Sequence, residues 1–285
     1  MNQSQLAIVR SALLKAGSIA LSSPVRNRGG EGRRIGRGNG NALEFVDYRN
    51  YAAGDDLRRL DWRVYARSEQ LMVKVFAEEI DPRCDLLLDG SASLGTVPGV
   101  AETALGIAAL LAAAAKNAGF SLSVWHSQEQ LKREEHPFSP LEWSCGEFDA
   151  PSSPDAVLAG FAGSFYPRGL RIAVTDLLWP GSPSEFLSRF CAGASRTVLI
   201  VPGDSGDIGD DASGNRRLID AESGEEREIV LDSDARRRYR ERLSRHRELW
   251  ERTAHEYGVM LLRPKFTGTP ESWELGIFFQ AGLFK

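Results

Sequence analysis

The chain has 285 residues, of which 42% are hydrophobic and 26% are charged, so it is long enough to bury a core and balanced enough to be globular. These values exclude the disordered, collagen-like and coiled-coil classes. Thirty-five basic residues against 39 acidic ones leave a net charge of −4, so the molecule as a whole is not an electrostatic binder of nucleic acid. The three cysteines lie outside any CxxC pattern, which favours a reducing compartment, and we expect a cytoplasmic protein.

The chain begins with a weakly helical segment that leads into a glycine- and arginine-rich loop. Residues 1–22 predict a short helix and lack the apolar core of a signal peptide. Residues 22–41 hold six glycines and five arginines, which predicts a flexible cationic loop. The loop has two interpretations, an anion clamp for phosphate or nucleic acid and a solvated surface loop. The absence of flanking aromatic residues favours the second.

A small wedge of two strands and a helical turn is predicted next. Alternating apolar residues indicate strands over 43–51 and 71–76. The spacing of Leu60, Trp62 and Tyr65 indicates a helical turn between the two strands.

After Pro82 the pattern repeats in the order strand then helix, which is typical of a parallel sheet covered by helices. The apolar window 104–115 is about twelve residues long where a membrane span needs roughly twenty, so it predicts a buried helix and no membrane contact. The predicted strands are 85–89, 120–125, 171–175, 196–201 and 259–262, and the predicted helices are 100–118, 154–163, 183–191 and 234–257.

The last predicted helix carries one apolar stripe and, on its other faces, charges of both signs that are typical of a surface in water. Residues 203–232 before it predict an insertion, with a hairpin that turns at Ser223 and Gly224. The stripe consists of Tyr239, Leu243, His246, Trp250, Thr253 and Tyr257.

One motif of acidic and hydroxyl side chains follows the first strand of the predicted sheet. Asp89, Ser91 and Ser93 form a DxSxS sequence at the carboxyl end of that strand, where open α/β sheets bind ligands. Asp176 follows another apolar strand and would emerge at the same edge. Carboxylate and hydroxyl oxygens are hard donors that suit Mg²⁺ or Mn²⁺, so these four residues are the predicted metal ligands.

The motif resembles the metal-ion-dependent adhesion site of the von Willebrand factor A-like domain. That site uses DxSxS, a threonine from a later loop and an aspartate after a later strand. The resemblance implies a Rossmann-type, mostly parallel sheet flanked by helices, and binding without turnover, because an acidic residue of a partner completes the metal coordination. The chain departs from the pattern in the later loop, where Ser152 and Ser153 are the hydroxyl residues.

The segment before this motif narrows the resemblance to domain-of-unknown-function family 58. That family places a charged block with GDD, DW and AR sequences directly before a von Willebrand A-like domain. Its members are often encoded beside MoxR-type AAA+ ATPases, so the resemblance implies an ATPase partner, or a client protein that offers an acidic residue, in a chaperone-like or complex-maturation role. In this chain the block includes Arg49, Asp55, Asp56, Asp61, Trp62 and Arg67.

We therefore predict two parts, residues 1–80 with the N-terminal helix, the loop and the wedge, and residues 81–285 with the von Willebrand A-like domain. The charged residues of the wedge have two interpretations. They form a surface for a partner or a support around the metal, with Arg49 or Arg67 orienting carboxylates, or they form a structural network of ion pairs.

Enzymatic functions have less support. The chain has neither a GxSxG nucleophile elbow nor a P-loop lysine, and His246 lies on an apolar stripe, which predicts a core histidine. A Mg²⁺-dependent phosphoester hydrolase that uses Asp89 and Asp176 is the alternative. Asp85 would lie roughly 13 Å from Asp89 along its strand, at about 3.3 Å per residue, so only two carboxylates converge and no general base is evident. We expect a non-enzymatic, metal-assisted adaptor.

Overall fold

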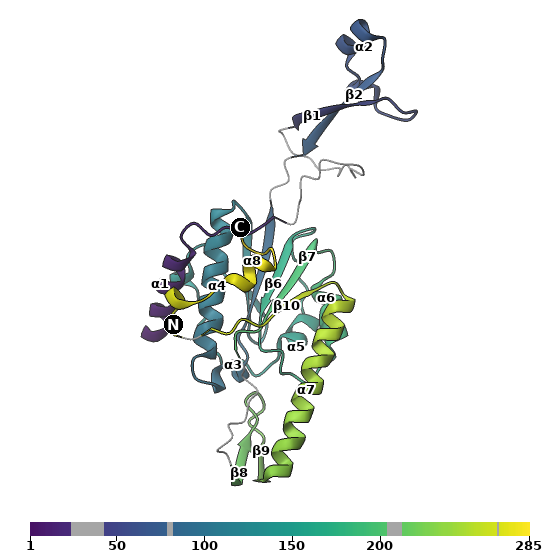
Figure 1. Ribbon diagram of the computed structural model, residues 1–285. Helices are drawn as coiled ribbons and strands as arrows, with labels where there is room; N and C mark the ends of the chain where they lie inside the picture. Colours follow the sequence, from purple (N-terminus) through teal and green to yellow (C-terminus); the bar gives the residue numbers. More distant parts are fainter. Residues whose placement is uncertain (24–42, 79–81, 204–212, 267) are drawn as a thin grey trace. The chain divides into compact units, whose positions relative to one another are not determined.

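The computed structural model describes residues 1–23, 43–78, 82–203, 213–266 and 268–285 (Figure 1). The chain divides into two compact units, one formed by Met1–Val25 with Pro82–Lys285 and the other by Arg26–Asp81. The units thus place the first 25 residues with the sheet, whereas the predicted parts divide at residue 80. The loop predicted over 22–41 lies, beyond Ser23, outside the described residues.

A six-stranded sheet forms the centre of the larger unit. Every neighbouring pair of strands is parallel except β4 with β5, so the predicted mixed α/β architecture with a mostly parallel sheet is confirmed. The edge strand β5 was not predicted, because it is too short to show an alternating pattern. In spatial order the strands are β10 (Met260–Leu262), β7 (Arg196–Ile200), β6 (Leu170–Val174), β3 (Arg83–Asp89), β4 (Ser121–Ser127) and β5 (Leu131–Arg133).

Helices cover both faces of this sheet, because its central strands are apolar on both sides. On one face lie α1 (Gln3–Ala16), α4 (Val100–Asn117) and the C-terminal α8 (Gly276–Gln280). The other face is covered by α5 (Pro154–Ala159), α6 (Pro183–Phe190) and α7 (Ser233–Glu256). The predicted helices are confirmed, with ends that shift by a few residues.

Helix α4 is apolar around most of its circumference because it lies between the sheet and α1. It is the one helix among the described residues that is long and apolar enough to cross a membrane, yet 72% of that stretch is buried inside the unit. The prediction of a buried helix here is confirmed. Gly106 permits the close packing, since a Cβ atom at this position would lie 2.7 Å from the Trp273 ring.

The N-terminal segment is also joined to the C-terminal one. The Leu21 N–H donates to the Ala114 carbonyl at 3.0 Å, which fixes the segment after α1 on the end of α4. The Lys285 N–H donates to the Ala20 carbonyl at 2.9 Å, and the Ser22 N–H donates to the Leu283 carbonyl at 2.8 Å. Residues at the two ends of the described chain therefore complete one folded body.

The apolar stripe predicted for α7 requires a correction. Leu243, Trp250 and Thr253 are buried as predicted, but Tyr239 is 36% exposed and Tyr257 is 41% exposed. The first turns of α7 extend past the sheet and run beside β9 (Figure 1). The spacing therefore predicts which face of the helix is apolar, but not how much of that face other elements cover.

The insertion before α7 forms the predicted hairpin. Strands β8 (Gly214–Ile219) and β9 (Glu226–Leu231) pair antiparallel, and the turn between them includes Ser223 and Gly224. Gly224 has a φ of +70°, which glycine adopts without strain. Almost every residue of both strands is exposed, and Leu231 is the buried one.

The smaller unit also has the predicted elements. Strands β1 (Leu43–Asn50) and β2 (Met72–Glu78) pair antiparallel. Between them lie the 3₁₀ helix η1 (Leu57–Arg59) and helix α2 (Trp62–Ser68), which replaces the predicted helical turn.

Candidate functional site

The DxSxS residues lie where the prediction put them, at the carboxyl end of β3. The neighbouring strand β6 runs parallel to β3, with Leu88 opposite Val174, so Thr175 and Asp176 follow at the same edge of the sheet. Helix α3 (Ala92–Thr96) begins inside the motif. Two chain segments that are far apart in sequence thus bring Asp89 and Asp176 to one place.

Hydrogen bonds hold the Asp89 carboxylate in a single orientation. The Ser91 N–H donates to Asp89 Oδ1 at 2.8 Å, and the Thr175 hydroxyl donates to Asp89 Oδ2 at 2.6 Å. The hydroxyls of Ser91 and Ser93 lie 3.0 Å apart. Asp89, Ser91 and Ser93 are therefore joined through hydrogen bonds at the carboxyl end of β3.

The electrostatics of Asp89 are unfavourable for a negative charge. Its side chain is fully buried, and Asp176 is only 4% exposed. Burial, followed by repulsion from Asp176, raises the pKa of Asp89 from its ordinary 3.8 to about 7, even though the Thr175 and Ser91 hydrogen bonds oppose the rise. Two carboxylates in such surroundings attract protons or a cation.

The backbone around the motif is held closely by its neighbours. The Ala150 N–H donates to the Gly90 carbonyl at 3.1 Å, and the Ala92 N–H donates to the Ala150 carbonyl at 3.2 Å. A Cβ atom at residue 90 would clash with the Ser127 carbonyl and would lie 2.8 Å from His126 Nε2. Glycine is therefore required at this position for space.

Two residues that the sequence analysis did not select also belong to the site. Thr175 donates to Asp89, and its position directly before Asp176 was an available signal, since it ends the same strand. Glu222, in the β8–β9 turn, accepts a hydrogen bond from the Ser93 N–H at 3.3 Å. No local pattern indicates this second contact, because it joins residues 129 positions apart.

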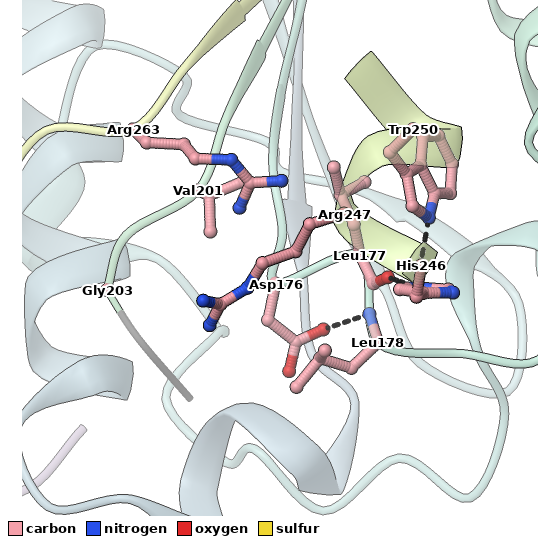
Figure 2. Close-up of a pocket in the computed structure, with 9 residues that line it drawn as sticks. All are labelled: Asp176, Leu177, Leu178, Val201, Gly203, His246, Arg247, Trp250 and Arg263. Carbon is pink, nitrogen blue, oxygen red and sulfur yellow. Dashed lines mark hydrogen bonds between the residues drawn. The ribbon is translucent and has the colours of Figure 1, made fainter. Parts of the chain in front are cut away.

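A small recess lies beside Asp176 (Figure 2). Arg247 and Arg263 line it together with Asp176, so basic and acidic groups share its wall. The Leu178 N–H donates to Asp176 Oδ1 at 3.0 Å. His246 Nε2 lies 2.6 Å from the Leu177 carbonyl, and the side chain is half-buried, whereas a core histidine was predicted.

The residues present fit a hard divalent cation. Among the residues that the structure describes, no three His, Cys, Asp or Glu side chains gather as metal ligands. A cation here would take carboxylate oxygens from Asp89 and Asp176 and hydroxyl oxygens from Ser91 and Ser93. Such an all-oxygen donor set suits Mg²⁺ or Mn²⁺ and does not suit zinc.

Asp85 has a different role, as its predicted place at the far end of β3 implies. Its carboxylate accepts hydrogen bonds from Trp125 Nε1 at 2.9 Å and from the Tyr166 N–H at 2.6 Å. Burial raises the pKa of this carboxyl group. Asp85 fixes the opposite end of the sheet and adds no third acid to the site.

The charged residues predicted in the wedge lie in the smaller unit. Arg49 donates to both carboxylate oxygens of Asp55, with Nη1 and Oδ2 2.6 Å apart, and this contact lowers the pKa of Asp55 to about 2. Asp56 caps η1 by accepting from the Arg58 N–H at 3.0 Å. Arg67 is exposed on α2.

Asp61 is the centre of a second network in this unit. Its carboxylate accepts from the Tyr48 hydroxyl at 2.8 Å, forms an ion pair with Lys74 at 3.0 Å, and caps α2 by accepting from the Arg63 N–H at 2.9 Å. These contacts, with the Tyr48 hydrogen bond first, hold the pKa of Asp61 well below its usual range. For Arg49, Asp55 and Asp61, the contacts described are those of a structural network.

Comparison with known protein families supports the predicted resemblance to domain-of-unknown-function family 58. The family described as "Protein of unknown function DUF58" matches residues 47–138, a range that includes both the charged block and the DxSxS motif. No curated protein matches the chain.

Two solved structures are similar over much of the chain, but only weakly. An aerotolerance-related membrane protein from Bacteroides fragilis NCTC 9343 is 14% identical, with a TM-score of 0.36, over 67% of this chain and 94% of that one. The conserved hypothetical protein BatB from Bacteroides thetaiotaomicron is 11% identical, with a TM-score of 0.35, over 65% of this chain and 91% of that one. Likeness at this level bears on neither the fold nor the function of this chain.

Proposed function

We propose that this chain, whose residues 47–138 match the family described as "Protein of unknown function DUF58", is a non-enzymatic adaptor that binds a partner protein through a metal ion. Asp89, Ser91, Ser93 and Asp176 would hold Mg²⁺ or Mn²⁺ at the carboxyl edge of a von Willebrand A-like sheet. One observation carries the proposal, namely the fully buried Asp89 carboxylate beside Asp176, with its raised pKa.

Burial of Asp89 beside Asp176 is unfavourable when both carboxylates are ionised. Ionised carboxylates that are buried side by side repel each other and have lost their water. A divalent cation removes both penalties, because it neutralises the charges and accepts their lone pairs. A bound ion would supply a Lewis acid to which a carboxylate oxygen of a partner could bind.

The remaining groups of the site would orient these ligands. The hydrogen bonds from Thr175 and from the Ser91 N–H fix both oxygens of Asp89, and each oxygen keeps a second lone pair for a cation. Thr175 stands directly before Asp176, so it supports from β6 the carboxylate that β3 provides. Such supporting hydrogen bonds are typical of metal sites that are built for binding.

For the partner, we propose a MoxR-type AAA+ ATPase, or a client protein with an exposed acidic residue, in a chaperone-like or complex-maturation role in the cytoplasm. The family resemblance supports the partner and its role, and the cysteine pattern supports the cytoplasm. A Mg²⁺-dependent phosphoester hydrolase is the weaker proposal, because Asp85 is engaged at the other end of β3 and, among the described residues, no third acid or histidine ligand joins the pair.

The first experiment is calorimetric titration of Mg²⁺ and Mn²⁺ into the metal-free protein. We expect the wild type and Asp234→Asn to bind, since Asp234 lies at the exposed start of α7, and we expect Asp89→Asn to lose binding. Unchanged binding by Asp89→Asn, or no binding by any of the three proteins, would contradict the proposed site.

The second experiment separates binding from turnover. The wild type should capture a MoxR-type ATPase in Mg²⁺ and lose it in a chelator, and Asp89→Asn should not capture it. Hydrolysis of p-nitrophenyl phosphate that Asp89→Asn abolishes would instead support the hydrolase.

A further inference from the structure

We infer that Glu222, at the tip of the β8–β9 hairpin, is an internal acidic ligand that occupies the DxSxS site of its own chain, so that a partner has to displace the hairpin. The inference rests on the proposed function for its ligand chemistry. It adds a residue and a competition that the proposed function does not contain.

The first observation is the contact itself. Glu222 Oε1 accepts from the N–H of Ser93 at 3.3 Å, and Ser93 is one of the four proposed ligands. The Ser93 hydroxyl is 3.0 Å from the Ser91 hydroxyl, so the Glu222 carboxylate contacts the backbone of a residue whose side chain lies beside another proposed ligand. It brings the same chemical group that an acidic residue of a partner would bring.

The second observation is that the turn is built to present this side chain. The Asp220 carboxylate accepts from the Ser223 N–H and from its hydroxyl, both at 2.7 Å. The Gly224 N–H donates to the Asp220 carbonyl at 2.9 Å, which closes the turn. Ala221 and Glu222 are half-buried, whereas Asp220, Ser223, Gly224 and Glu225 are exposed, so Glu222 is the acidic residue that the turn directs inward.

The third observation is that most of the hairpin lies outside the core. Its strands are exposed along nearly their whole length, and β9 contacts the first part of α7, which also extends past the sheet. Figure 1 shows the hairpin beside α7, with its turn directed to α3. Paired strands keep the hairpin stiff, and it buries little apolar area, so displacement of its tip leaves the core intact.

These features predict a competition within the chain. A group tethered on the same chain acts at an effective concentration on the order of mM, which an external carboxylate has to exceed. Removal of the Glu222 charge should therefore weaken metal binding, because a ligand is lost, and strengthen binding of a partner, because a competitor is lost.

The test compares Glu222→Gln with Glu225→Gln in the full chain, with Mn²⁺ as the probe. Glu225 lies in the same turn, but its side chain is paired with Arg227 at the surface, so its variant controls for the charge of the hairpin. Glu222→Gln should bind Mn²⁺ about tenfold more weakly than the wild type and Glu225→Gln. Its bound Mn²⁺ should also relax water protons more strongly, because water takes the place of the carboxylate. Equal affinity and equal relaxation in all three proteins would overturn the inference and leave the proposed function standing.

A second measurement needs no metal. In the metal-free protein, Glu222→Gln should speed amide exchange in peptides that cover 89–96 and 214–231, and Glu225→Gln should not. If no protein binds Mn²⁺, the proposed function fails, and the exchange result alone decides whether Glu222 occupies the site. Equal exchange in the wild type and Glu222→Gln would then overturn the inference.

Discussion

Asp55 and Asp61 of the smaller unit and Asp89 of the larger unit lie in electrostatic surroundings of opposite effect. Asp55 and Asp61 of the smaller unit form ion pairs with Arg49 and Lys74, and their pKa values lie below the ordinary 3.8. Asp89 of the larger unit has a second carboxylate as its electrostatic neighbour, and its pKa lies above that value.

This difference separates structural charges from charges that are prepared for a ligand. The acids of the smaller unit have cations from the same chain, so their interactions are used in holding β1, β2 and α2 together. At the DxSxS motif, burial and repulsion from Asp176 raise the pKa of Asp89, and an added cation would offset both effects. The comparison favours the larger unit as the place of ligand binding, and three predictions test it.

The largest expected effect concerns the stability of the metal-free protein at different pH. The pKa of Asp89 is about 7 in the folded chain and lies near 3.8 when unfolded, so the folded chain binds the additional proton between these values. Stability should therefore fall as the pH rises from about 4 to 7, by on the order of 3 kcal/mol. Chemical unfolding in a chelator at pH 5 and pH 8 measures the change.

Asp89→Asn provides the control for that measurement. The amide has nearly the same shape and does not ionise, so the variant should be more stable than the wild type at pH 8 and should lose most of the pH dependence. Excess Mg²⁺ should stabilise the wild type at pH 8 and not the variant. An equal decline with pH in both proteins would show that other groups cause it.

An intermediate effect is expected from two glycines, one in each unit. Gly90→Ala places a Cβ atom 2.8 Å from His126 Nε2, so it should cost about 1–3 kcal/mol of stability and weaken Mn²⁺ binding, because the motif has to shift. Gly54 has a φ of +103° and nothing within 4 Å of an added Cβ, so Gly54→Ala should strain the smaller unit and leave Mn²⁺ binding unchanged. Mn²⁺ binding that both variants lose, or that neither loses, would contradict the separation of the units.

The smallest effect is expected from Asp61→Ala. The change removes the cap of α2, so amide exchange at Arg63 and Val64 should become at least about fivefold faster, as for other lost helix caps. Mn²⁺ affinity should stay at the wild-type value, because the network is confined to the smaller unit. A decrease in that affinity would instead support the interpretation of the wedge as a support for the metal.

Much of the larger unit could be predicted because its strands are short apolar runs that end in polar residues. The run 86–88 with Asp89 after it, and the run 172–174 with Thr175 and Asp176 after it, each indicate a buried strand and its carboxyl end. Parallel order then brings the two acids to one edge. The resemblance implies a threonine in a later loop, where this chain has serines. The threonine that contacts Asp89 is Thr175, which directly follows β6.

The contact of Glu222 with Ser93 could not be predicted in this way. The turn at Ser223 and Gly224 has a local signature, but where its tip lies depends on how an exposed hairpin leans on α7. No apolar periodicity reports that direction. For the same reason, the apolar spacing of α7 does not predict that Tyr239 and Tyr257 at the ends of its stripe are exposed.

The hydrogen bonds that join Ala20 and Ser22 to Lys285 and Leu283 have a consequence for folding, because they connect segments that are far apart in the sequence. The smaller unit has short-range pairing and is synthesised early, so it can fold while the rest of the chain is still emerging from the ribosome. The larger unit closes later, because the segment after α1 pairs with residues that lie far along the sequence. Contacts of such long sequence separation form slowly, so the apolar face of α1 stays exposed until the later segments pack against it.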